Sequence, residues 1–253
     1  MKIGRGRRTG RRLAMIAGVL PVLLAACGTP GYQYIRNTST RSAFKIPTGW
    51  TTFDKATYLG LPSGPQPSAP DPIRWLVALD GSPSPSVSHI VNSSDLATTY
   101  PQGLALVYHL NPVTRDSVSL QKLRNFLFPV DFFQNPDDIQ FLSYNDSVLL
   151  DQNRVHGVKL SYQFRENALP DAISASQQQQ GESTGGPPAP GASLVGGSFS
   201  SGLGPTFVHV DQVAYLDANS QNVYFLALLC SATCFDRNHA AIETAVSSWT
   251  VLP

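Results

Sequence analysis

Charged residues are scarce in this chain of 253 residues: they make up 14% of it, and only five are lysines. In soluble domains, charged residues make up about 25% of the sequence on average. Six of the 18 Lys and Arg precede residue 27 and no acid does, so residues 27–253 hold 12 bases against 17 acids. Proteins that bind nucleic acid concentrate positive charge on one face. We therefore expect no nucleic-acid partner, and the same balance disfavours an anionic membrane surface.

The sequence also lacks the motifs of four large classes of catalytic or nucleotide-binding site. It contains no G-x-S-x-G, H-E-x-x-H, G-x-x-x-x-G-K-[ST] or G-x-G-x-x-G segment. Asp131, Asp137 and Asp138 could be imagined as paired carboxylates, but adjacent acids around Pro136 favour a solvated turn. We expect no catalytic residue and no cofactor.

The five histidines are scattered along the sequence. Three of them lie in predicted strands and are interpreted as hydrogen-bonded sheet residues. The alternative is that these three bind one metal ion together. These three are His109, His156 and His209. We therefore expect no metal site.

Long hydrophobic runs are absent apart from the segment 13–26, which follows a basic start ending at Arg12. Its 14 residues are too few to cross a hydrocarbon core of roughly 30 Å as a helix, and the pattern is typical of a cleaved export signal. The following segment, 24–28, reads LAACG and resembles the bacterial lipobox, in which the cysteine takes a diacylglycerol before cleavage. A plain secretory signal is the alternative.

We therefore predict a lipoprotein signal peptide at 1–26 and an extracytoplasmic protein held at the cell membrane by acylated Cys27. Arg11 and Arg12 leave the twin-arginine export route open, but Ala14 favours the general secretory route, because the twin-arginine signal prefers a bulky apolar residue there.

Only two cysteines remain after Cys27, and they lie four positions apart behind an apolar strand. Disulfides persist outside the cytoplasm, so the sequence predicts a local disulfide between Cys230 and Cys234. A redox or metal site would need a C-x-x-C motif or more ligands, and only His239 lies nearby in the sequence.

One folded domain is predicted over residues 41–253, behind a polar, lipid-anchored tether at 27–40. Helices are expected over 117–128, capped by Asp116 or Ser117, and after a cap at Asp236. Within 174–204, Gln, Gly, Ser and Pro make up 22 of 31 residues, so we predict a disordered insertion there. The predicted strands lie at 43–47, 50–53, 73–79, 104–110, 140–144, 147–150, 155–164, 207–216, 223–229 and 249–251.

Several of these segments resemble the PsbP-like domain. The runs HVDQVAYL (209–216), NVYFLAL (222–228) and SWTV (248–251) look like the closing hairpin and last strand of that domain. FKIP (44–47) followed by Trp50, and VHGVKLSY (155–162), resemble its earlier segments. Exported bacterial lipoproteins of the LpqN type carry this domain behind a lipobox.

The resemblance implies an α+β fold with a single antiparallel β-sheet flanked by helices, an α/β/α sandwich. It also implies a binding or assembly partner rather than a catalyst, here a module of the bacterial cell envelope that binds an envelope or secreted protein. The alternatives are a carrier of an apolar small ligand and a hydrolase with an unrecognised site in the crevice between sheet and helix. A cavity lined by Trp75, Tyr108 and Tyr162 would favour the carrier.

The lipobox interpretation predicts that Cys27→Ala moves the protein from the membrane pellet to the medium, or leaves it unprocessed. No other hydrophobic segment of the sequence is long enough to hold the chain in a bilayer. Fractionation at high salt, with the unaltered chain as control, measures this. A variant that still pellets with the membranes would contradict the interpretation.

Overall fold

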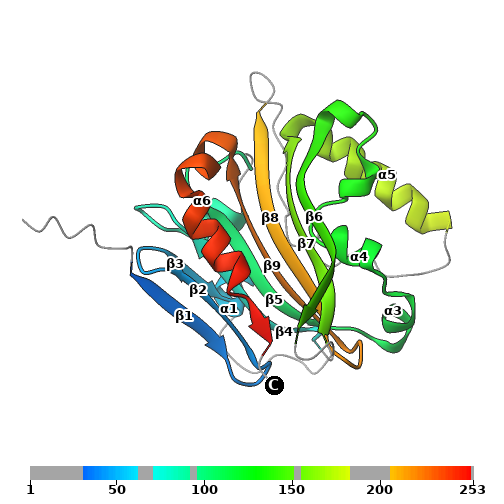
Figure 1. Cartoon of the computed structure of the whole chain (residues 1–253), viewed down its shortest axis with the longest axis horizontal. Coiled ribbons are helices and arrows are strands. Elements are labelled where there is room, and N and C mark those ends of the chain that lie inside the picture. Colours follow the sequence, from blue (N-terminus) through cyan, green and yellow to red (C-terminus); the bar gives the residue numbers. More distant parts are fainter. Residues whose placement is uncertain (1–30, 62–70, 92–95, 151–154, 183–205, 252–253) are drawn as a thin grey trace, which may run out of the picture.

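The computed structural model describes residues 31–61, 71–91, 96–150, 155–182 and 206–251. Cys27 lies outside these ranges. Ten strands form two antiparallel sheets (Figure 1). The larger sheet has the strand order β3-β4-β5-β9-β8-β7-β6, and the smaller sheet has the order β1-β2-β10. The predicted α+β class, with antiparallel strands flanked by helices, is confirmed, although the strands divide between two sheets.

The strand bounds follow the predicted segments closely in the larger sheet, except that the two strands predicted at 140–144 and 147–150 form the single strand β6. Its strands are β3 (Thr51–Asp54), β4 (Ile73–Asp80), β5 (Gln102–His109), β6 (Ile139–Leu150), β7 (Val155–Arg165), β8 (Phe207–Leu216) and β9 (Asn222–Ser231). The smaller sheet consists of β1 (Tyr32–Asn37), β2 (Ser42–Pro47) and β10 (Thr250–Val251).

Strand β9 shows why other elements must pack on both faces of the larger sheet. Phe225 and Ala227 point to one face and Leu226 and Leu228 to the other, and all four are buried. Antiparallel strands usually keep one face in water, whereas a strand that is apolar on both faces requires a layer on each.

The two covering layers differ in kind. Helices α1 (Lys55–Leu59), α2 (Ser88–Val91), α4 (Leu120–Arg124) and α5 (Leu169–Glu182) pack on one side, which we call the helix-rich face. Helix α6 (Ala232–Ser247) and the smaller sheet pack on the other side, which we call the α6 face. Helix α3 (Pro112–Ser117) connects β5 to α4.

The predicted tether at 27–40 requires correction, because the six residues of β1 lie within it. Tyr32, Tyr34 and Ile35 are of types that favour strands, and β1 pairs antiparallel with β2 along its whole length. Ile35 packs against the core of the α6 face. The domain therefore begins about ten residues earlier than predicted.

Both predicted helices have different bounds in the structure. After Ser117, the last residue of α3, the segment 117–128 contains only the short helix α4. It is capped by Ser119, whose Oγ accepts a hydrogen bond from Lys122 N at 3.2 Å. Helix α6 begins after Ser231 rather than Asp236, because Ser231 Oγ accepts the Cys234 N–H at 3.3 Å.

The predicted disordered insertion at 174–204 is wrong over its first nine residues, which are the last nine of the 14 residues of α5. Leu169 and Ala172 are fully buried and Ser176 nearly so, and this packing holds the helix on the sheet. The remainder of the predicted insertion, 183–204, lies outside the described residues.

Within the described ranges, none of the helices combines the length and the apolar character needed to cross a membrane.

The close contact between β7 and β8 allows a test of the register in which these two strands pair. A Cβ atom at Gly157 would overlap the carbonyl oxygen of Ala214 and come within 2.7 Å of Tyr215 Cδ1. Gly157→Ala should therefore lower the free energy of unfolding by about 1–3 kcal/mol, the usual cost of overpacking. Urea denaturation measures this, with Gly49→Ala as the control, since a Cβ at Gly49 meets nothing within 4 Å. Equal midpoints for the two variants would contradict the register.

Candidate functional site

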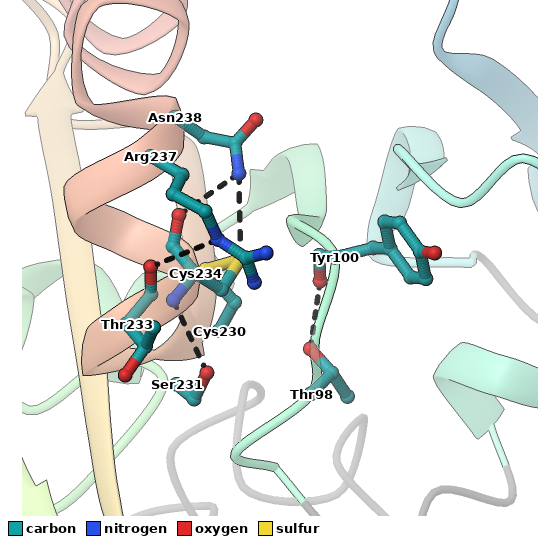
Figure 2. The surroundings of a disulfide bond; sticks show 8 residues. All are labelled: Thr98, Tyr100, Cys230, Ser231, Thr233, Cys234, Arg237 and Asn238. Carbon is teal, nitrogen blue, oxygen red and sulfur yellow. Dashed lines mark hydrogen bonds between the residues drawn. A yellow bond between two sulfur atoms is a disulfide. The ribbon is translucent and has the colours of Figure 1, made fainter.

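The structure contains the predicted disulfide, at the point where β9 passes into α6 (Figure 2). The Cα atoms of Cys230 and Cys234 lie 5.9 Å apart, and both residues are fully buried. Asn238 Nδ2 donates to the Cys234 carbonyl oxygen at 2.8 Å and lies 3.7 Å from Cys234 Sγ. Thiol–disulfide exchange requires access to a sulfur atom. Burial therefore favours a structural role, in which the bond fixes the first turn of α6 to the central strand.

The three residues predicted to line one crevice do not lie together. Trp75 is on the α6 face, where its ring stacks on Trp249 with centroids 6.0 Å apart and planes at 3°. Tyr108 and Tyr162 are on the helix-rich face. The sheet separates Trp75 from the two tyrosines, and the prediction of one cavity lined by all three requires correction.

Tyr162 makes a buried structural link. Its hydroxyl donates to Gln212 Oε1 at 3.0 Å, and Gln212 Nε2 donates to the Arg124 carbonyl oxygen at 2.9 Å. Burial raises the pKa of Tyr162 well above its usual value, and the negative charge of Asp211 adds to the effect. The hydroxyl therefore joins β7, β8 and α4.

The acids considered as a carboxylate pair are separated in the structure. Asp131 receives two hydrogen bonds from Arg124, with Nε at 2.8 Å and Nη2 at 2.6 Å. Asp138 lies 3.4 Å from Arg165 Nη1, and Asp137 is exposed in a turn capped by Asn135. Two of the three carboxylates thus have guanidinium partners of their own.

A polar cluster that the sequence analysis missed lies on the α6 face. Ser161 Oγ is 3.0 Å from His209 Nε2, and Asp211 Oδ1 is 3.7 Å from the same nitrogen. The imidazole ring stacks under Phe235 of α6, with centroids 3.2 Å apart and planes at 5°. His209 and Asp211 share a face because they are two positions apart in β8, and Ser161 is the register partner of Asp211 on β7.

These three residue types suggest a Ser-His-Asp hydrolase, but their arrangement differs from a catalytic triad. In a triad the acid binds the imidazole nitrogen opposite the one that takes the serine proton. Here Ser161 and Asp211 approach the same nitrogen, and Asp211 Oδ1 is buried without a hydrogen-bond partner in the described structure. The cluster therefore lacks the geometry that would activate Ser161.

The histidines lie in separate parts of the structure and have different partners. His89 Nδ1 lies 2.8 Å from Asp80, and His109 Nδ1 lies 3.1 Å from Asn222. Among the residues with described positions, no group of three or more His, Cys, Asp or Glu is placed to hold a metal ion.

Strand β6 carries an exposed apolar group at one edge of the larger sheet. Phe141, Leu142 and Tyr144 are 43%, 46% and 44% exposed, and we call them the β6 patch. The rings of Phe141 and Tyr144 meet edge to face with centroids 6.4 Å apart. β6 is the last strand in the sheet order, and no other described strand pairs with its outer edge. The patch therefore combines apolar side chains with a strand edge that no described strand covers.

No family model and no curated protein matches the chain. Similar solved structures include the solution structure of cyanobacterial PsbP (CyanoP) from Synechocystis sp. PCC 6803, at 11% identity and a TM-score of 0.35, covering 90% of this chain and 98% of that one. They also include the Ran-binding protein Mog1p of Saccharomyces cerevisiae, at 7% identity and a TM-score of 0.40, covering 88% and 97%. Both neighbours are PsbP-like folds.

The disulfide closes a loop of only a few residues, which limits its contribution to stability. On the loop-entropy model, reduction should cost about 2 kcal/mol, the low end of the usual range. The purified protein, acylated at Cys27, should show no free thiol under denaturing conditions until it is reduced, and two afterwards. Thiol titration before and after reduction measures this, with Cys230→Ser/Cys234→Ser as the control. Two reactive thiols in unreduced protein would contradict the bond.

Proposed function

We propose that the chain is an exported lipoprotein, anchored by acylated Cys27 on the extracytoplasmic side of the cell membrane, and that it serves the bacterial cell envelope as a non-catalytic binding or assembly module. The lipobox-like segment supports the anchor. The Cys230–Cys234 disulfide is consistent with this location, because such bonds persist in oxidising compartments.

The observation that carries the binding role is the β6 patch. Exposed apolar groups at an open strand edge promote unwanted pairing, and proteins usually avoid them unless a partner uses them. Leu142 lies at an irregularity in the β6–β7 ladder, between Phe141 and Ser143, and has no register partner on β7. The occupant we propose is an extended apolar segment of a cell-envelope or secreted protein, lying along β6 as an added strand.

The hydrolase and carrier alternatives have less support from the arrangement of the residues. A hydrolase would need a second group to orient the imidazole of His209 from its other nitrogen, and Asp211 lies on the Ser161 side. A carrier built on Trp75, Tyr108 and Tyr162 would need a cavity that passes through the sheet.

The binding role predicts that Phe141→Ser/Leu142→Ser weakens partner capture about tenfold or more, because apolar anchors at an interface centre carry much of the binding energy. Cross-linking in intact envelopes followed by mass spectrometry measures capture. The matched control is Val113→Ser, which removes an apolar side chain that is 67% exposed on α3. Circular dichroism should show the same fold for both variants. Equal capture by the double variant and the control would overturn the assignment of the β6 patch.

A further inference from the structure

Positive charge is concentrated at one end of the folded chain. The first acid of the sequence is Asp54, and the segment between Cys27 and Asp54 holds Arg36, Arg41 and Lys45. From Asp54 onward, nine bases face 17 acids. The three cations belong to β1, β2 and the turn between them. The smaller sheet is therefore positive and the rest of the domain negative.

Two of these cations share one face of the smaller sheet with an exposed aromatic ring. Tyr34 is opposite Lys45 in the β1–β2 register and is 56% exposed. Arg36 Cζ lies 5.0 Å and Lys45 Nζ 5.2 Å from the Tyr34 ring centroid. The opposite face of the sheet, with Ile35 and Phe44, packs into the core. We call the residues Tyr34, Arg36 and Lys45 the β1–β2 outer face.

The cations of the smaller sheet differ from several other cations of the domain in having no described acidic partner. Within the described ranges, Arg36, Arg41 and Lys45 form no ion pair with an acid. By contrast, Arg124 and Arg165 each lie beside an aspartate. The charge on the β1–β2 outer face is therefore available to a negative partner.

Chain length fixes how far this sheet can be from Cys27. Four residues, 28–31, separate Cys27 from Tyr32 at the start of β1. The five Cα–Cα steps from Cys27 to Tyr32, at up to about 3.6 Å each, span at most roughly 18 Å. If the acyl chains of Cys27 lie in a bilayer, the beginning of β1 is held near the headgroups.

We propose that the β1–β2 outer face lies against the anionic headgroups of the membrane, where Arg36 and Lys45 contact lipid phosphates and Tyr34 lies in the interface. This inference rests on the acylation of Cys27 proposed above. Basic residues are attracted to anionic leaflets, and tyrosine is enriched at membrane interfaces. The acid-rich remainder of the domain is repelled from the same surface, so the two effects favour one orientation.

This orientation also places the β6 patch. In Figure 1, β1 and β6 lie toward opposite ends of the long axis of the molecule. Since Cys27 holds the β1 end near the lipid, β6 lies toward the end of the molecule that is farther from the anchor.

Lysine modification of the lipidated, full mature protein in vesicles tests the orientation. The protein is reconstituted in phosphatidylglycerol or phosphatidylcholine vesicles and acetylated with a water-soluble reagent, and each lysine is quantified by mass spectrometry. Lys45 should react about fivefold more slowly in phosphatidylglycerol, and salt at about 1 M should restore its rate by screening. Lys122, exposed on α4, is the internal control and should react equally in both lipids.

A pair of charge-matched variants separates the local contact from total charge. Arg36→Gln should restore much of the Lys45 reactivity in phosphatidylglycerol, whereas Arg237→Gln, exposed on α6, should leave the protection unchanged. Equal Lys45 rates in the two lipids, for a chain whose intact mass shows acylation and which floats with the vesicles, would overturn the orientation alone. An intact mass without acyl chains would overturn the anchor and the orientation together.

Discussion

Burial of the central strands on both faces is the constraint on which the rest of this structure depends. Phe225 and Leu226 are neighbours in β9, point in opposite directions and are both completely buried. No single layer can cover both side chains. The chain therefore supplies short helices on one face, and α6 with the smaller sheet on the other. The Cys230–Cys234 bond lies where β9 passes into the second of these layers, so it fixes the start of α6 over the strand that most needs cover.

Local sequence patterns predicted the central strands β5 and β9 because an apolar run buried on both faces is visible without knowledge of its neighbours. The helices were harder to predict. Leu120, Leu123 and Leu127 fit a helical stripe, but Leu127 is buried from irregular chain that follows α4. Burial alone gives the same pattern of apolar residues, so periodicity over one or two turns did not distinguish a helix from a packed loop. β1 was missed because its alternation is weak and its partner β2 supplies most of the contacts with the core.

The candidate sites show the same division between local and non-local information. Prediction of the disulfide required only two cysteines at close spacing and an oxidising compartment. Prediction of the crevice required knowing which face of the sheet each of three strands presents. An irregularity between Ile73 and Trp75 changes the face on which Trp75 lies. Ile73 packs with Tyr108 on the helix-rich face, whereas Trp75 packs with Trp249 on the other. The Ser161, His209 and Asp211 cluster likewise depends on the register of β7 against β8, which no pattern within either strand determines.

Net charge proved a poor guide to the surfaces of this molecule. The excess of acid over residues 27–253 disfavours an anionic membrane when the charges are counted together. Electrostatic interactions between exposed groups are largely screened beyond about 10 Å at moderate salt, so a surface responds to the charges on its nearest face. The smaller sheet carries Arg36, Arg41 and Lys45 without an acid in its own strands, and the described acids belong to other elements. A membrane near β1 is therefore attracted by the charges closest to it, and the negative charge farther away helps to keep the remainder of the domain off the lipid.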